Sequence, residues 1–251
     1  MSELIYKPKG AALEYGEYAF NGYIGCPHNC SYCFNKTGNL SNLFTNEAKL
    51  RKCFKDNTDA INQYRKEFIK KESLIKSTND KSVFLSFVTD PFIETTVNLT
   101  LEIIKINAKK DIYTRILTKN ASWITDNYYF DIMKPYKNFI KFGFTITNQD
   151  ILEPNASPNI DRMIALQKLS KLNYYTWISM EPLISFEKGL NIIRDTIDIT
   201  DEYKIGLEST FIQYDSKDVS QFVNDVEKYI MRTPIHRPIV YFKESIKKYL
   251  K

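Results

Sequence analysis

Residues 25–34 read G-C-P-H-N-C-S-Y-C-F, which places Cys26, Cys30 and Cys33 within one stretch of eight residues. The fourth cysteine of the chain, Cys53, stands apart from them. The spacing C-x3-C-x2-C is short enough for one loop to wrap around a compact metal centre. Thiolates are the usual ligands of iron–sulfur clusters, and three of them suit a 4Fe-4S cluster whose fourth iron stays open. The stretch therefore predicts a metal-binding loop.

A structural zinc site is the alternative for these cysteines. Such a site normally has four ligands, commonly arranged as two well-separated pairs. His28 or Cys53 could supply the fourth ligand, yet Cys53 follows two basic residues in a predicted helix and has no second ligand beside it. The spacing therefore favours the cluster. We expect His28 to face solvent, and the alternative is that it donates a hydrogen bond to the cluster or its loop.

The composition is that of an ordinary soluble globular protein, with 43% hydrophobic and 26% charged residues. No stretch approaches the roughly 20 apolar residues of a membrane helix, and the polar N-terminus lacks the apolar centre of a signal peptide. We therefore expect a cytoplasmic protein without a membrane partner. In a reducing compartment, closely spaced cysteines are more often metal ligands or catalysts than disulfides. The net charge of +5 is spread through the chain, so it permits an anionic partner without demanding one.

Short apolar runs alternate with segments of helical periodicity along most of the chain. Six runs rich in β-branched and aromatic residues predict strands, at residues 18–24, 82–88, 112–117, 139–146, 174–180 and 203–207. Helices are predicted between them, among others at residues 60–70, 96–108 and 158–172. Strands alternating with helices imply a mostly parallel α/β sheet, in which ligands bind beyond the carboxyl ends of the strands. We therefore look for function just after each strand.

Two helical segments allow more specific predictions. The helix at 158–172 is expected to bury one broad apolar face, formed by Ile160, Met163, Ile164, Leu166, Leu169 and Leu172. Residues 215–231 predict another helix, and residues 237–251 a short strand or loop followed by a lysine-rich helix. We expect one domain overall, with a core at residues 1–208 and a C-terminal extension at residues 209–251 packed on it.

Five motifs together resemble the radical S-adenosylmethionine (SAM) enzymes, and in particular the branch of spore photoproduct lyase and its photolyase-like relatives. They are N-G-Y-I-G-C-P-H-N-C-S-Y-C-F at 21–34, L-S-F-V-T-D-P-F at 85–92, I-L-T-K-N at 116–120, F-G-F-T-I-T at 142–147 and E-P-N-A-S-P-N-I-D-R at 153–162. The resemblance runs from about residue 6 to residue 182. It implies a TIM-like partial (β/α)6 barrel with a C-terminal helical extension, a 4Fe-4S cluster on the three cysteines, and SAM as cofactor.

The resemblance also implies roles for individual residues. It places Thr89 and Asp90 as acceptors for the SAM ammonium, and Lys119 as the partner of the SAM carboxylate. Other cofactor contacts are implied near the adenine for Tyr32, at the ribose for Thr145 or Thr147, and close to that region for Glu153 and Arg162. Glu181 and Glu208 follow the last two predicted strands, so they could hold adenine or ribose or contact the substrate.

The sequence departs from the lyase at one point. In spore photoproduct lyase a cysteine before the T-S-D stretch donates hydrogen to the product radical, whereas this chain has Phe87 and Val88 there. We therefore do not expect repair of spore photoproduct, and Cys53 could replace the missing donor only if the fold brought it inward.

Three classes of function stay open at this point. The first is a radical enzyme that acts on a nucleic acid or a nucleobase-containing substrate, which the resemblance and the mild basic excess favour. The second is a radical enzyme that acts on a peptide or small metabolite. The third is an iron–sulfur electron-transfer or binding protein without SAM chemistry. Either enzyme would need a low-potential electron donor such as flavodoxin or ferredoxin.

Overall fold

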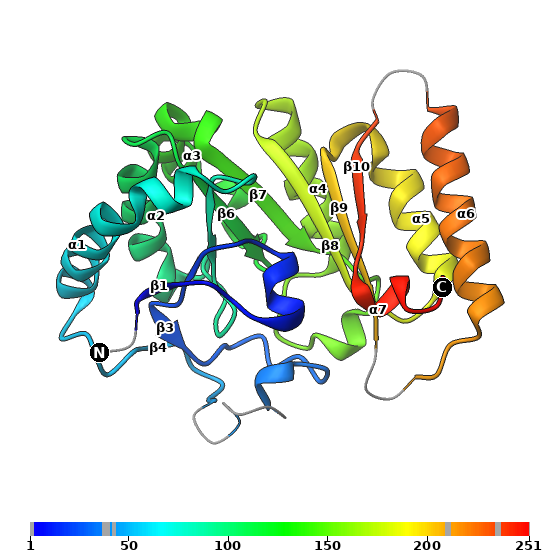
Figure 1. Cartoon of the computed structure of the whole chain (residues 1–251), viewed down its shortest axis with the longest axis horizontal. Helices are drawn as coiled ribbons and strands as arrows, with labels where there is room; N and C mark the ends of the chain where they lie inside the picture. Colours follow the sequence, from blue (N-terminus) through cyan, green and yellow to red (C-terminus); the bar gives the residue numbers. More distant parts are fainter. Residues whose placement is uncertain (1–2, 37–40, 42–43, 209–211, 234–236, 251) are drawn as a thin grey trace.

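One sheet of eight strands forms the centre of the molecule, in the order β1-β2-β5-β6-β7-β8-β9-β10 (Figure 1). The computed structural model describes residues 3–36, 41, 44–208, 212–233 and 237–250. β1 runs antiparallel to β2, and all other neighbouring strands of this sheet are parallel. The strands are β1 (Ile5–Tyr6), β2 (Ala19–Phe20), β5 (Ser82–Leu85), β6 (Tyr113–Thr118), β7 (Ile140–Thr145), β8 (Tyr175–Leu183), β9 (Glu202–Leu207) and β10 (Ile239–Phe242).

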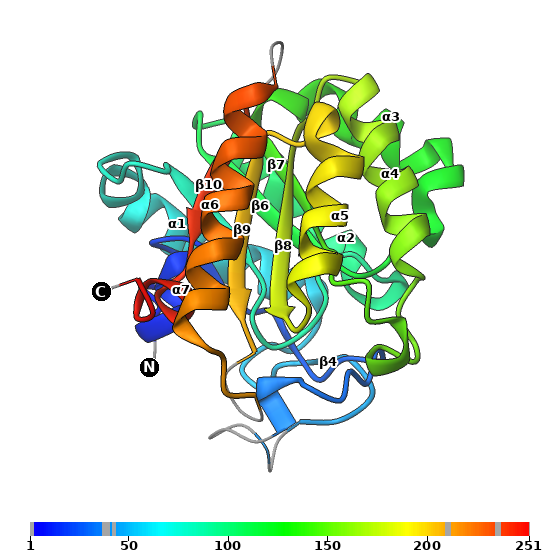
Figure 2. The same cartoon turned by 90° about the vertical axis from the view of Figure 1, so that its right-hand side faces the viewer.

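Helices follow the parallel strands and cover the outer face of the curved sheet (Figures 1 and 2). They are α1 (Asn57–Lys76), α2 (Glu94–Ala108), α3 (Asn127–Met133), α4 (Asn159–Lys171), α5 (Phe186–Thr196), α6 (Ser216–Arg232) and α7 (Glu244–Lys247). Within the described residues the edge strands β1 and β10 do not pair, so the barrel stays open. The predicted partial (β/α)6 barrel is confirmed. None of the helices in the described ranges is long and apolar enough to cross a bilayer.

The first predicted strand, at residues 18–24, is split in the structure. Its first half is β2, which joins the large sheet, and its second half is β3 (Tyr23–Ile24). β3 leaves the sheet and pairs with β4 (Lys49–Leu50) in a separate antiparallel ribbon. The split carries the chain away from the barrel wall just before the cysteine loop, so this loop lies beyond the end of β2.

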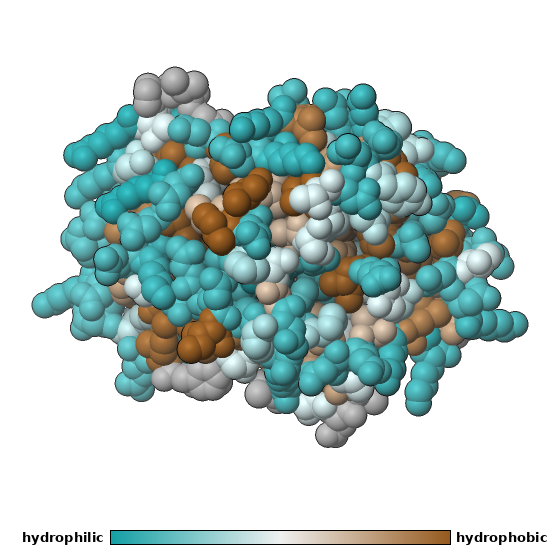
Figure 3. Space-filling model, turned by 180° about the vertical axis from the view of Figure 1, so that it is seen from behind, coloured by the Kyte–Doolittle hydropathy of each residue, from teal (hydrophilic) through white to brown (hydrophobic). Residues whose placement is uncertain are grey.

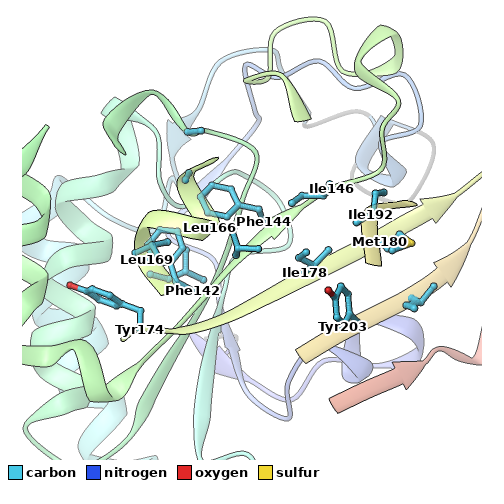
Figure 4. Close-up of a cluster of buried hydrophobic side chains, with 14 of the residues drawn as sticks. Phe142, Phe144, Ile146, Leu166, Leu169, Tyr174, Ile178, Met180, Ile192 and Tyr203 are labelled. Atoms are coloured by element: carbon cyan, nitrogen blue, oxygen red, sulfur yellow. The ribbon is translucent and has the colours of Figure 1, made fainter. Parts of the chain in front are cut away.

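Alternation along the strands separates the outer core from the barrel interior. Phe142 and Phe144 of β7, and Ile178 and Met180 of β8, belong to the largest hydrophobic cluster, which also includes Leu166 of α4 (Figure 4). The residues between them on each strand point to the opposite face of the sheet, because side chains alternate along a strand. This opposite face lines the inside of the barrel.

A tryptophan fills the middle of the barrel. Trp177 of β8 is fully buried and packs in a small cluster with Ala19 and Phe84. Its indole lies against Gly143 of β7, where an added Cβ would come within 2.2 Å of the ring. The missing side chain at Gly143 therefore makes room for Trp177. This plug divides the interior into two ends, at the amino and carboxyl ends of the strands.

The buried face of α4 differs from the prediction. Ile160 and Ile164 are more than half exposed, at 60% and 54%, and Leu172 is also exposed, whereas Leu166 and Leu169 are buried as expected. The fully buried Arg162 occupies part of the inward face instead. Apolar periodicity predicts the helix correctly but not its buried face. A paired arginine can be buried where the pattern predicts an aliphatic side chain.

The C-terminal region continues the strand and helix alternation. α6 follows β9 where a helix is predicted at residues 215–231, and it buries Val219, Phe222, Val223 and Val226. β10 then extends the sheet next to β9, and α7 lies beside the N-terminal 3-10 helix Gly10–Glu14 (Figures 1 and 2). The amide of Glu244 donates to Oε1 of Glu14 at 2.8 Å. The predicted boundary after residue 208 falls next to residues 209–211, which lie outside the described residues, so it stays a prediction.

Hydrophilic side chains cover most of the face opposite to that of Figure 1, and the hydrophobic ones gather in several separate patches (Figure 3). Scattered apolar side chains of this kind are ordinary on a protein surface. The patches on this face therefore need no functional explanation.

Candidate active site

A cavity of about 600 Å³ lies at the carboxyl ends of the parallel strands. Its wall includes all three cysteines of the loop. Among the other residues that resemblance singled out, Tyr32, Thr89, Asp90, Lys119, Thr145, Glu181 and Glu208 also line it, whereas Thr147, Glu153 and Arg162 do not. The structure thus gathers residues from six segments of the chain around one space, at the end of the sheet where ligands of parallel sheets bind.

The cysteine loop begins at a glycine that its backbone conformation requires. Gly25 has a φ of 85°, and a Cβ at this position would lie 2.2 Å from the carbonyl oxygen of Glu47. The close approach of these segments lets the amide of Cys26 donate to the carbonyl of Thr45 at 2.9 Å. Asn29 is also left-handed, with a φ of 53°. The loop can therefore turn back on itself between its first two cysteines.

Residues 150–155 hold the loop from the other side. The amide of Ser31 donates to the carbonyl of Leu152 at 2.9 Å, and the amide of Asn155 donates to the carbonyl of His28 at 3.3 Å. The side-chain amide of Asn155 donates to the carbonyl of Pro27 at 3.0 Å. The cysteine backbone is therefore fixed by a distant segment and does not depend on its own turns alone.

Two predictions about residues near the loop are wrong, namely that His28 faces solvent and that Cys53 lies in a helix. His28 is 5% exposed and does not face solvent, because its Nε2 lies 2.7 Å from Oδ2 of Asp90 and its Nδ1 lies 3.2 Å from the carbonyl of Asn155. Cys53 is exposed in a turn ahead of α1, which begins only at Asn57. It does not line the cavity.

Asp90 is the most heavily bonded group of the cavity wall. Its carboxylate accepts hydrogen bonds from the amides of Phe92 and Lys119, both at 2.8 Å, and from the hydroxyl of Thr118 at 2.7 Å. His28 adds the contact described above. Burial alone would raise the pKa of Asp90, but the hydrogen bond and charge of His28 and the two amides hold it below its usual value. The carboxylate is therefore an anion.

The three thiols share one wall of the cavity. Cys26, Cys30 and Cys33 are free thiols on the wall of the same cavity. Within the described ranges, no three His, Cys, Asp or Glu side chains converge on a point that one metal ion could occupy. In a cubane cluster each of three thiolates would bind a different iron. Burial, followed by the charge of Asp90, raises the pKa of Cys26 to about 12, and a coordinated metal would offset this by deprotonating the thiol.

Lys119 carries a positive charge into the cavity beside the cysteines. Its Nζ lies 5.5 Å from the ring centroid of Tyr32, and no acidic side chain in the described part of the chain forms an ion pair with it. Burial alone lowers the pKa of Lys119, but the charges of Cys30 and Glu153 outweigh it and raise the pKa above its usual value. An ammonium without an ion-pair partner is suited to bind a ligand carboxylate.

The three threonines of the predicted site differ in position. Thr89 lines the cavity, and its buried hydroxyl has no hydrogen-bond partner among the described residues. A buried polar group of this kind costs about 1–3 kcal/mol unless something binds it. Thr145, the last residue of β7, also lines the cavity. Thr147 lies outside the wall, and its buried hydroxyl likewise has no hydrogen-bond partner among the described residues. Thr89 and Thr145 are thus the two that a ligand would meet.

Glu153 and Arg162 lie behind the cavity wall. They form an ion pair of 2.6 Å, and both side chains are fully buried. Glu153 accepts a hydrogen bond from the Tyr32 phenol, and Arg162 donates to the carbonyl of Thr145 at 2.8 Å. The pair thus supports Tyr32 and Thr145 from behind the wall, and its contact with a cofactor stays a prediction.

At the opposite end of the cavity Glu181 is hydrogen-bonded to Tyr15 and Lys243, two residues that sequence analysis missed. Oε2 of Glu181 accepts hydrogen bonds from Nζ of Lys243, at 2.5 Å, and from the phenol of Tyr15, whose oxygen also lies 2.9 Å from Oγ of Ser179. No motif marks Tyr15. Lys243 directly follows the strand I-V-Y-F of β10, so the rule that function lies just after each strand would have found it.

More than nine tenths of the chain superposes on radical SAM enzymes of known structure. Spore photoproduct lyase complexed with dinucleoside spore photoproduct has a TM-score of 0.69 at 14% identity, covering 96% of this chain and 80% of the lyase chain. The fold is that of the radical SAM enzymes. Streptococcus suis SuiB bound to S-adenosylmethionine and SuiB bound to its precursor peptide SuiA share this fold, with TM-scores of 0.58 and 0.65 at 15% identity. This chain covers 53% and 50% of those two chains, and 93% and 92% of its own length is matched.

The radical SAM fold is established by structure alone in this protein. No family model matches the sequence, and no curated protein does. At 14–15% identity the comparisons speak for the fold, and the roles of the cavity residues rest on their own geometry.

Proposed function

We propose that the protein is a radical SAM enzyme that binds a 4Fe-4S cluster and SAM in the cavity at the carboxyl ends of the strands. The observation that carries the proposal is that three free thiols share one cavity of a radical SAM fold with an ammonium and a hydroxyl that have, respectively, no ion pair and no hydrogen bond among the described residues. When bound, the cluster and SAM together supply a 5′-deoxyadenosyl radical. The protein orients the reactants and excludes competing reactions.

Each residue of the cavity has a task in this proposal. Cys26, Cys30 and Cys33 hold the cluster as thiolates, and Lys119 binds the SAM carboxylate with its ammonium. The hydroxyl of Thr89 accepts from the SAM ammonium, which would satisfy its buried oxygen. A low-potential donor such as flavodoxin or ferredoxin supplies the electron.

Anaerobic reconstitution with iron and sulfide tests the first half of the proposal. We expect about four irons and four sulfides per chain, and a change in the cluster spectrum when SAM is added. Incubation with dithionite and SAM should then release 5′-deoxyadenosine and methionine. One zinc and no sulfide in the purified protein would contradict the cluster. Intact SAM beside a fully reduced cluster, with no spectral change, would favour an electron-transfer protein.

For the substrate we propose a nucleic acid or another nucleobase-containing molecule. Phe34, Phe44 and Phe87 line the cavity, and Phe34 is 61% exposed. Such aromatic faces stack on bases, at about 1–3 kcal/mol per base. The fold is shared with a lyase complexed with a dinucleoside, which supports the same substrate class.

A peptide substrate is the second candidate, because SuiB bound to its precursor peptide has the same fold. The charged residues of the cavity wall favour a peptide as much as a nucleic acid. Of the three lysines in the wall, Lys243 is paired with Glu181 and Lys119 lies beside the cysteines, which leaves Lys9 as the remaining cation for a phosphate. A nucleic-acid backbone would therefore lie outside the cavity, with only a base inside.

Deuterium transfer separates the two substrate classes. Reconstituted protein is incubated with SAM, dithionite and deuterium-labelled pools of DNA, RNA, nucleotides or peptides, and 5′-deoxyadenosine is analysed for deuterium. Label from a nucleic-acid or nucleotide pool supports the proposal, and label from peptides alone would overturn it. Binding of nucleic acid should also weaken steeply as salt rises, because phosphate contacts release counterions.

A further inference from the structure

A continuous set of buried hydrogen bonds joins the cysteine loop to the strand end that carries Lys119. It begins at His28, between the first two cysteines, whose Nε2 lies 2.7 Å from Oδ2 of Asp90. The same oxygen accepts the amide of Lys119 at 2.8 Å and the hydroxyl of Thr118 at 2.9 Å. The side chains of His28 and Asp90 are only 6% and 4% exposed. The loop and the lysine are thus connected through one carboxylate.

The bonding capacity of Asp90 is filled from within the chain. An ionised carboxylate offers about four acceptor sites. Four donor groups occupy them, namely the Nε2 of His28, the hydroxyl of Thr118 and the amides of Phe92 and Lys119. A ligand ammonium would have to displace one of these buried donors and leave it without a partner, which costs about 1–3 kcal/mol. Thr89, the residue just before Asp90, has a buried hydroxyl with no hydrogen-bond partner among the described residues.

We propose that His28 and Asp90 are positioning residues, which fix the cysteine loop relative to Lys119, and that Asp90 is not a ligand of the SAM ammonium. This inference rests on the proposed binding of a cluster and SAM. The loop fixes the position of the cluster, and Lys119 fixes the position of the SAM carboxylate. The link between the loop and Lys119 therefore fixes the distance between the cluster and SAM. Groups that orient metal ligands in this way typically change affinity or activity by about 10- to 100-fold when removed.

A SAM analogue that lacks the amino group distinguishes positioning from direct binding. We expect Asp90→Asn to weaken binding of SAM and of the deamino analogue alike, each by about tenfold, so that their affinity ratio stays within about twofold of the wild-type ratio. If Asp90 binds the ammonium directly, the variant will lose affinity for SAM alone and the ratio will fall toward one. That result would overturn the proposal.

His28 variants test the other half of the link. His28→Phe removes both ring nitrogens, and we expect the same loss of SAM affinity as in Asp90→Asn, with iron content retained. His28→Gln keeps a donor that can reach Asp90, so it should recover part of the affinity. The double variant His28→Phe with Asp90→Asn should be no weaker than either single variant, because both break one link. Full additivity would contradict it.

Hydrogen exchange in the metal-free protein gives a readout that needs no cofactor. His28→Phe and Asp90→Asn should each speed amide exchange across residues 26–33, and exchange in α6 should stay unchanged. Unaltered exchange in the loop of both variants would overturn the proposed link. This measurement is also independent of the proposed function, because a wild-type protein that bound neither cluster nor SAM would still report it.

Discussion

The two ends of the barrel interior both contain charged residues, but they use them differently. At the amino ends of the strands, Arg115 bonds to Asp80 at 3.2 Å and to Glu202 at 2.9 Å. Lys141 pairs with Asp80, and Lys204 lies 3.3 Å from Glu202. Each of these five charged side chains thus has an opposite charge beside it. At the carboxyl ends, the corresponding space is an open cavity.

The cavity end leaves some of its polar groups without protein partners. Lys119 has no ion pair, and the hydroxyl of Thr89 has no hydrogen bond, within the described residues. Two nitrogens of Arg115 at the amino end, Nε and Nη1, also lack hydrogen-bond partners among the described residues, so the two ends differ in their charge pairing. Desolvating an ammonium without an ion pair adds nothing to stability. We therefore predict that charge at the amino end stabilises the fold and that charge at the carboxyl end binds ligands. Each end can be altered separately to test this.

The largest effect is expected from the cysteines of the cavity end. Cys26→Ala, Cys30→Ala and Cys33→Ala should each abolish cluster binding and lower SAM cleavage by more than about 100-fold, because a cluster held by three thiolates cannot lose one. Cys53→Ala is the matched control and should keep full iron content, since Cys53 is exposed and lies outside the cavity. Iron and sulfide analysis with chromatography of 5′-deoxyadenosine measures both. A cluster that survives all three single substitutions would contradict the site.

At the amino end, Arg115→Met should destabilise the protein by about 3–5 kcal/mol, because it leaves Asp80 and Glu202 buried beside fewer positive charges. The guanidinium also lies 4.9 Å from the ring of Trp177, so the plug of the barrel loses a neighbour. Urea unfolding of the metal-free protein measures the loss, with the exposed Arg194→Met as control. SAM affinity of the folded fraction should stay within about twofold of wild type. A weakened affinity with unchanged stability would reverse the comparison.

Lys119→Met should have the opposite profile. We expect SAM affinity to fall by roughly 10- to 100-fold, since a charged hydrogen bond contributes about 1.5–3 kcal/mol. The stability of the metal-free protein should change little, because Lys119 has no ion pair to lose within the described residues. Titration of SAM into the reconstituted cluster measures the affinity, and the exposed Lys171→Met serves as control. Equal SAM affinity in both variants would show that Lys119 does not bind the ligand.

Sequence alone was most informative where the site is contiguous. The cysteine spacing and the residues just after the strands located Lys119, Thr89 and Thr145, because a motif within one loop or strand end keeps its geometry in any fold of this class. It was least informative where partners are distant in the chain. Tyr15 and Lys243 meet at Glu181 across more than 200 residues. No local pattern encodes such a meeting.

The wrong predictions have a common physical cause. His28 was expected to face solvent and Ile160 to be buried, because polar residues usually lie outside and apolar residues inside. In the structure His28 is buried with Asp90, and the inward place on α4 goes to Arg162, which is paired with Glu153. Burying a polar group costs little once its partners are provided. Those partners come from other segments, so hydrophobic periodicity could not reveal them.

The smallest expected effect is the pH dependence of the amino-end network. Burial alone would raise the pKa of Asp80, but Arg115 and Lys141 outweigh it and lower the pKa from 3.8 to about 2. A carboxyl group whose pKa is lower in the folded than in the unfolded protein stabilises the fold above its unfolded pKa, and loses this contribution as the pH falls through the folded one. The difference of nearly two units corresponds to at most about 2.5 kcal/mol. Wild type should therefore be more stable than Asp80→Asn by at most about this amount at pH 7. The gap should stay constant down to about pH 4 and close between about pH 4 and pH 2.

Urea unfolding of the metal-free protein across this range measures the gap, and Glu227→Gln, at an exposed carboxylate of α6, should show little or no gap. A gap for Asp80→Asn that persists at pH 2 would mean that the side chain stabilises the fold by its shape and hydrogen bonds. Charge pairing would then contribute less to stability at the amino end than the comparison with the cavity end requires.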